Sequence, residues 1–154
     1  MVSLESKLAF LRQPDSYPEP CARVETVETH MSWVFLTNRH AYKLKKPVRY
    51  GLLDFSTLDA RRFYCEEEVR LNRRLAPDVY LATVALVVDA QGHLALAPQG
   101  AAVDWLVKMR RLPACRMLDA MIQAGAADER QMRRVAALLA AFYRDCAPAA
   151  MAPD

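Results

Sequence analysis

Two lysines and a glutamate give this chain its clearest chemical signal. Lys43 and Lys45 alternate with apolar residues in the segment Ala41-Tyr42-Lys43-Leu44-Lys45, and Glu68 lies in a helix-like segment further on. Alternate side chains of a strand share a face, so Ala41, Lys43 and Lys45 are predicted to point the same way. A strand lysine held by a helix glutamate is a recurring way to bind nucleotide phosphates. Ala41, being small, leaves room beside them for a flat base.

The same lysines also fit a solvated edge strand, in which charge opposes edge-to-edge association. Glu68 helps to choose between the two interpretations. Helical spacing places it on a predicted sheet-facing stripe with Tyr64, Leu71 and Leu75. A buried carboxylate needs a partner, and a lysine from the sheet is the natural one. The alternative is a half-exposed Glu68 paired with Arg61 or Arg70.

The rest of the pattern predicts the elements that position these residues. Leucines at helical spacing behind Ser3 predict a short helix, which prolines end from Pro14 onward. Residues 31–36 and 41–46 are predicted strands, joined in an antiparallel hairpin by the polar turn 37–40. A long helix is predicted from Ser56, with Ser56 and Asp59 as its capping box, to about Leu75.

Further strands are predicted at residues 80–89, 93–97 and 103–109, with a turn at 89–92. After Pro113 the spacing becomes helical up to Gly125, and a last helix begins near Asp128. The apolar stripe of that helix is Met132, Val135, Leu139 and Phe142. Strands on both sides of one long helix predict an α+β fold, an antiparallel sheet with that helix packed on one face.

Composition limits the functional class. The 154 residues are 53% hydrophobic and 25% charged, which predicts one folded domain, and a net charge of +3 gives no general field for nucleic acid. Four well-separated cysteines predict reduced thiols packed in a core, and no zinc site. The amino terminus does not read as a signal peptide, and no apolar run is long enough for a membrane span. A cytoplasmic protein is therefore expected.

Several segments carry a resemblance to a known family. They are residues 28–36, 41–48, 53–58, 68–77, 105–113 and 140–143. The most specific are Tyr42-Lys43-Leu44-Lys45-Lys46-Pro47-Val48 and Leu71-Asn72-Arg73-Arg74-Leu75-Ala76-Pro77. Over roughly residues 20–146 the chain resembles a bacterial group related to aminoglycoside phosphotransferases. In that group a kinase-like domain is often fused to a separate P-loop kinase-like, ATP-binding domain.

The resemblance implies a protein-kinase-like small lobe with a five-stranded antiparallel sheet, one packed long helix and a hinge. The domains would be a helix and link at 1–20, the lobe with its hinge at 21–112, the first two helices of a large lobe at 113–146, and a disordered tail at 147–154.

The resemblance also implies roles for individual residues. Lys43, or alternatively Lys45, would bind the α- and β-phosphates of ATP, and Glu68 would hold the lysine. Backbone groups of Lys108, Met109 and Arg110 would form the hinge that reads adenine. Residues 29–33 would cover the phosphates, with Ser32 and backbone amides as donors because that loop has no glycine.

The catalytic parts of such a kinase are missing from the pattern. None of the three histidines is followed two positions later by aspartate, and there is no Walker motif. Asp54-Phe55-Ser56 precedes the long helix, so we interpret it as a helix lead-in and not as a magnesium-binding motif. We therefore expect ATP binding without magnesium ligands or turnover by this chain alone, which is either a fragment or a natural short form.

Two other functions stay open. Without a large lobe, the apolar surface formed by the hinge strand and by the stripe of the last helix could bind a partner chain or a second copy. That stripe is Met132, Val135, Leu139 and Phe142. Arginines along the helices could bind an RNA backbone, although their spacing is more typical of a solvated face. These arginines are Arg61, Arg62, Arg70, Arg73, Arg74, Arg110 and Arg111.

Overall fold

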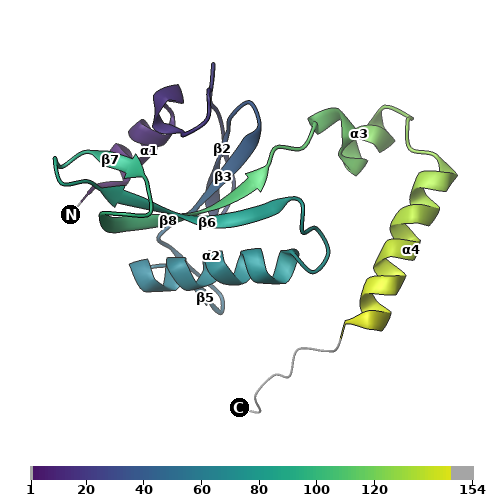
Figure 1. The fold of residues 1–154 in the computed structure, drawn as a ribbon. Coiled ribbons are helices and arrows are strands. Elements are labelled where there is room, and N and C mark those ends of the chain that lie inside the picture. The colour runs from purple at the N-terminus through teal and green to yellow at the C-terminus, as the bar shows by residue number, and fades with distance from the viewer. Residues whose placement is uncertain (1, 147–154) are drawn as a thin grey trace, which may run out of the picture. The chain divides into compact units, whose positions relative to one another are not determined.

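The structure of the protein is a computed structural model, and it describes residues 2–146. The chain divides into two compact units between Arg111 and Leu112 (Figure 1). The first unit contains the sheet and two helices, and the second is helical. None of the helices in the described residues has the length and apolar character that crossing a membrane requires.

The first unit is built on a six-stranded antiparallel sheet with the order β1-β2-β3-β8-β6-β7. Its strands are β1 (Glu25–Glu28), β2 (Ser32–Leu36), β3 (His40–Lys45), β6 (Tyr80–Val88), β7 (Leu94–Leu96) and β8 (Ala101–Arg110). The strands β4 (Arg49–Tyr50) and β5 (Leu53–Asp54) pair separately. The predicted α+β class is confirmed. The expected five strands are corrected to six in this sheet, because β1, which lies outside the predicted strand ranges, pairs with β2 at one edge.

The two faces of the sheet carry different cores. The helix α1 (Leu4–Leu11) packs on one face, against a cluster that includes Phe35, Leu44 and Leu106. The helix α2 (Leu58–Asn72) packs on the other, where Cys65 and Val69 contact Val107 (Figure 1). Consecutive residues of β8 therefore pack in different cores: Leu106 in the one under α1 and Val107 in the one under α2, as expected for a strand covered on two faces.

Both predicted turns are present. In the β2–β3 hairpin the amide of Thr37 donates to the carbonyl of His40 at 2.9 Å. In the β6–β7 turn the Asp89 carboxylate accepts from the amides of Gln91 and His93, at 2.9 Å and 2.8 Å. Gly92 in that turn has a φ of 86°, a conformation that favours glycine.

The helix α2 differs in detail from its prediction. Its N-cap is Thr57, whose hydroxyl accepts from the amide of Ala60, so the predicted Ser56 cap is wrong by one residue. The helix ends at Asn72 and not near Leu75. Its buried positions are Arg61, Cys65 and Val69, whereas Leu71 and Leu75 of the predicted stripe are 41% and 40% exposed. The predicted stripe is wrong because the prediction used apolar residues to find the buried face, and the buried face of α2 includes the charged Arg61.

Arg61 is buried because Asp104 of β8 neutralises it. Arg61 Nε donates to Asp104 Oδ1 at 2.7 Å, and Lys7 Nζ from α1 donates to Asp104 Oδ2 at 2.8 Å. The three side chains are 7%, 4% and 10% exposed, in the order Arg61, Asp104, Lys7. One carboxylate therefore ties both helices to the central part of the sheet. The predicted solvated face for Arg61 is wrong.

The cysteines are free, as expected, but only Cys65 is buried. Burial raises the pKa of the Cys65 thiol to about 12, so this thiol stays protonated at neutral pH. Cys115 is exposed, and Cys21 and Cys146 are partly exposed. The expectation that all four thiols pack in a core is wrong, because three of them lie in loops or helix ends outside the sheet.

The second unit contains a short 3₁₀ turn (Ala114–Arg116) and the helices α3 (Leu118–Gln123) and α4 (Glu129–Asp145). Gly125 ends α3 in a left-handed conformation with a φ of 63°. Asp128 and Gln131 form a capping box at the start of α4. The tail predicted at 147–154 lies outside the described residues.

Asp104 generates the first prediction. Asp104→Ala leaves the buried Arg61 and Lys7 without their shared counter-charge, so we expect the free energy of unfolding to fall by about 3–5 kcal/mol. Glu66→Ala breaks an exposed pair with Arg62 in α2 and should cost less than about 1 kcal/mol. Urea denaturation of the two variants measures the difference. Equal, small losses would show that the buried network contributes little.

Candidate functional site

Glu68 pairs with both of the lysines that were predicted as alternatives to each other, on the α2 face of the sheet. Lys43 Nζ lies 2.9 Å from Glu68 Oε1, and Lys45 Nζ lies 2.6 Å from Glu68 Oε2. One carboxylate thus bridges two ammonium groups, and the cluster carries one excess positive charge. The alternative partners predicted for Glu68 are wrong, since Arg61 binds Asp104 and Arg70 binds Glu67.

Strand register and helix phase explain this meeting. Lys43 lies opposite Val34 in β2 and Val107 in β8, and Val107 belongs to the cluster under α2. Glu68 precedes the buried Val69 by one position and follows the buried Cys65 by three, so it lies on the sheet-facing side of α2. The strand period of two and the helix period of 3.6 therefore bring the three charged groups to one place.

The two lysines differ in their surroundings. The Lys45 side chain is 7% exposed, and its ammonium lies 5.1 Å from the centre of the Phe55 ring. The Lys43 side chain is 29% exposed. Lys45 is therefore enclosed by protein, whereas Lys43 can offer donor hydrogens to a ligand.

Electrostatics keep Glu68 ionised. Burial acts to raise the pKa of Glu68, but the hydrogen bonds and charges of Lys45 and then Lys43 outweigh burial and hold the pKa below its usual 4.5. The carboxylate is therefore charged at neutral pH and holds both ammonium groups in place.

Ser32 is buried at the start of β2, directly opposite Lys45. Its amide donates to Thr29 Oγ1 at 3.0 Å, and the Thr29 amide donates to the Ser32 carbonyl at 2.8 Å. Both amides are used within the β1–β2 turn. Two of the amides expected to cover a phosphate are therefore already occupied.

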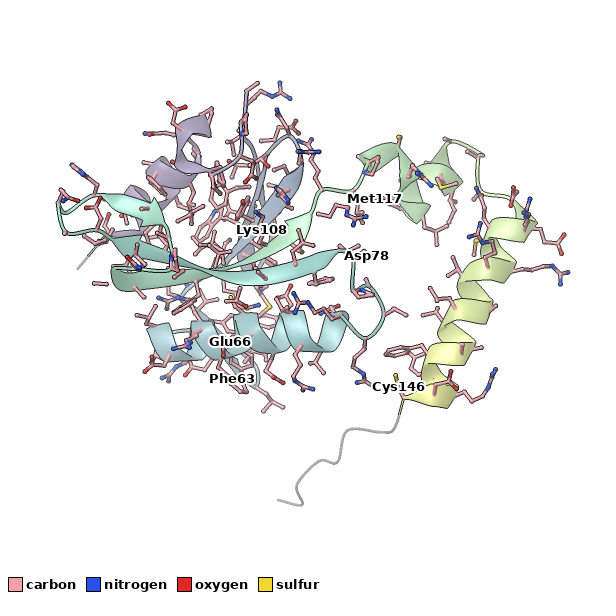
Figure 2. All side chains as sticks on the ribbon, viewed as in Figure 1. Phe63, Glu66, Asp78, Lys108, Met117 and Cys146 are labelled. Carbon is pink, nitrogen blue, oxygen red and sulfur yellow. The ribbon has the colours of Figure 1, made fainter. Side chains whose placement is uncertain are left out.

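The residues expected to read a base lie in a strand. Ala41 lies opposite Met109 across the β3–β8 ladder, and both share the face of Lys43. Lys108 is turned to the other face, where its ammonium lies 5.4 Å from the Tyr42 ring centre (Lys108 is labelled in Figure 2). The amide of Arg110 donates to the Val79 carbonyl at 2.8 Å. The strand predicted at 103–109 is confirmed as β8, and because β8 continues to Arg110 with partners on both sides, the hinge that the resemblance implies at 108–110 is corrected to strand.

Two nearby residues were missed from the sequence. Phe55, which is 4% exposed, packs on Lys45, although we interpreted its segment only as a helix lead-in. Tyr80 lies opposite Met109, and the pKa of its hydroxyl is raised by burial and then by the charge of Glu68. Phe55 lies in the resemblance segment 53–58 and Tyr80 lies outside all such segments, but in both cases only the tertiary structure shows the contact with the site.

Comparisons with known proteins give relatives without a stated function. Residues of this chain are 34% identical over 121 positions to the uncharacterized proteins Rv2004c of Mycobacterium tuberculosis and Mb2027c of Mycobacterium bovis. The match covers 79% of this chain and 22% of each relative, so the chain spans about a fifth of their length. No protein-family model matches the chain.

Among solved structures, a crystal structure of WbdD matches with a TM-score of 0.33 and 15% sequence identity. The match covers 75% of this chain and 24% of that chain. A similarity at this level supports no inference about fold or function.

The lowered pKa of Glu68 predicts a pH dependence of stability. A carboxylate whose folded-state pKa is depressed stabilises the fold above its unfolded pKa, and that contribution disappears as pH falls through the folded pKa. We expect the free energy of unfolding to decline below about pH 4.5 more steeply in the wild type than in Glu68→Gln. Urea denaturation between pH 7 and pH 3 measures this, with Glu66→Gln as the control, because the Glu66 side chain is exposed and forms its ion pair with Arg62. Parallel acid limbs for wild type and Glu68→Gln would contradict the assignment.

Proposed function

We propose that the first unit is a nucleotide-binding lobe, similar to the small lobe of an aminoglycoside-phosphotransferase-like kinase, and that its ligand is ATP. The observation that carries the proposal is the shared ion pair of Lys43 and Lys45 with Glu68 across β3 and α2. A strand lysine fixed by a helix carboxylate matches the arrangement that positions nucleotide phosphates in protein kinases.

The charge balance supports an anionic ligand. Two ammonium groups and one carboxylate leave one positive charge in a region where the carboxylate is only 14% exposed. A phosphate oxygen could accept from Lys43 without displacing Glu68, because an ammonium has three donor hydrogens. Charge-assisted bonds of this type are stronger than those between neutral groups.

The two lysines receive different roles in this proposal. Lys43, the more exposed, contacts phosphate, and Lys45 fixes Glu68 from the inside. Ala41 and Met109, on the same face further along the strands, provide the surface for the base. Backbone recognition of adenine by residues 108–110 is not part of the proposal, since β8 is paired on both sides.

Phosphoryl transfer is not proposed for these 154 residues alone. The reaction needs a group that orients the acceptor hydroxyl and carboxylates that hold magnesium. The sequence contains no His-x-Asp, and residues 2–146 hold no cluster of three or more histidine, cysteine or carboxylate side chains placed for a metal. The function assigned to the lobe is therefore nucleotide binding.

Isothermal titration calorimetry with ATP tests the proposal. We expect saturable binding, weakened about tenfold or more in Lys43→Met because a charge-assisted hydrogen bond is lost. Lys46→Met is the matched control, because Lys46 belongs to the opposite face and its ammonium lies 4.8 Å from the Trp33 ring centre.

Stability measurements distinguish the lysine proposed to contact phosphate, Lys43, from the lysine proposed to hold Glu68, Lys45. Lys45→Met should lower the melting temperature more than Lys43→Met, because Lys45 is the more deeply buried partner of Glu68. ATP binding that is absent from the wild type, or that is unchanged in Lys43→Met and Lys45→Met, would refute the proposed function while leaving the fold intact.

Self-association is a second candidate function, and it is favoured by the apolar stripe of α4. The predicted apolar stripe is present there but uncovered: Met132, Val135 and Leu139 are 42%, 40% and 38% exposed. Neighbouring Leu138 is 56% exposed. An amphipathic helix with an uncovered apolar face is typical of an interaction surface.

Sedimentation velocity over a concentration series tests self-association. We expect the sedimentation coefficient to rise with concentration in the wild type and to stay at the monomer value in Leu139→Glu, which puts a charge into the stripe. Ala137→Glu is the control, since helical spacing puts Ala137 on the side of α4 opposite the stripe. A wild type that remains monomeric at every concentration would exclude this function.

A further inference from the structure

A second cationic cluster lies at the first turns of α2, and it shares no side chain with the proposed nucleotide site. A cleft of about 440 Å³ opens between α1, the start of α2 and β8. Its lining includes Leu4 and Lys7 of α1, Leu58 and Arg61 of α2, and Val103 and Asp104 of β8. This volume lies in the range of small-molecule sites.

The charges in this cleft do not balance. Lys7 and Arg61 share one carboxylate, that of Asp104, and all three side chains are at most 10% exposed. No other charged residue lines the cleft among the described residues. A buried excess of one positive charge is costly, and a bound monoanion would neutralise it.

Both cations keep donor capacity. Lys7 donates to the Val103 carbonyl and to Asp104, which uses two of the three hydrogens of an ammonium. Arg61 donates to Asp104 through Nε and Nη2 and to the carbonyls of Phe55 and Ser56 through Nη1. These bonds use four of its five hydrogens within residues 2–146. Each cation can thus donate one further hydrogen bond to a ligand.

The uncharged residues that line the cleft indicate which kind of group would fit beside the negative charge of a ligand. Apart from the charged group and Ser56, the cleft is walled by apolar residues: Val2, Leu4, Pro47, Leu58, Ala102 and Val103. A fully hydrated inorganic ion would leave these side chains without a partner, whereas an apolar ring or chain would bury them. The start of α2, which borders the cleft at Leu58, adds a favourable field for negative charge.

From these observations we propose that the cleft binds a small organic carboxylate with a single negative charge and an apolar body. The carboxylate accepts from Lys7 and Arg61, and the apolar body lies against Leu4, Leu58 and Val103. The site shares no side chain with the Lys43–Lys45–Glu68 cluster. The proposal is therefore independent of the proposed nucleotide function.

Benzoate is a suitable probe, and NMR titration of the full chain is the measurement. We expect saturable shifts of the amides of residues 102–104, and no such shifts with benzyl alcohol, which has a similar body without charge. Lys7→Met should weaken benzoate binding about tenfold or more, because it removes the charge excess while keeping an apolar stem. Lys43→Met, the matched lysine variant in the other cluster, should bind benzoate as the wild type does.

A second variant keeps the test decisive if Lys7→Met does not fold. Ala102→Leu fills the cleft without changing its charge and should abolish benzoate binding while leaving ATP binding unaltered. Absence of saturable benzoate shifts in the wild type, or equal binding by wild type and Ala102→Leu, would overturn the proposal. Tighter binding of inorganic phosphate than of benzoate at the same residues would overturn the assignment of an apolar ligand body.

Discussion

The first unit depends on carboxylates that are each shared by two cations. Glu68 bridges Lys43 and Lys45, and Asp104 bridges Lys7 and Arg61. Removing ions from water is costly, so such clusters persist only where each ion has close partners of opposite charge and further hydrogen bonds. Together the two clusters fix α2 to the sheet at both its first turns and its middle. The helix could not move as a rigid element without breaking one of them.

The arrangement also leaves positive charge at two places under the helix. Each carboxylate neutralises one of its two cations, so each cluster retains one excess charge. At the Glu68 cluster the excess lies beside the more exposed Lys43, and at the Asp104 cluster it lies beside an apolar cleft. The two proposed anion sites, one for ATP and one for an apolar monoanion, therefore rest on the same arrangement of two cations around one carboxylate.

Because β8 lies between two strands and both faces of the sheet are covered, its backbone groups are used within the sheet. The strand β8 pairs with β3 on one side and β6 on the other, so its backbone stabilises the sheet up to Arg110. Its side chains divide between the two faces: Met109 lies with Lys43, and Lys108 lies with Tyr42. The central strand thus contributes side-chain surface to the proposed nucleotide site and keeps its backbone groups for the ladder.

The sequence by itself determined the α+β class, the two hairpins and the common face of Lys43 and Lys45, because strand and helix periods are local properties that fix which side chains share a face. It left the partner of Glu68 open between one of these lysines and Arg61 or Arg70. Only the tertiary structure decided the buried stripe of α2, the pairing of β8 on both sides as far as Arg110 and the packing of Phe55 on Lys45. These features depend on partners far away in the chain: Asp104 makes burial of Arg61 possible, and the carbonyl of Val79 accepts from the amide of Arg110. The spacing of residues within one element does not specify a counter-charge or a strand partner that comes from a distant part of the chain. The cationic cleft beside α1 could therefore not be predicted from the sequence, because it forms only where the fold brings Lys7 and Arg61 to the carboxylate of Asp104.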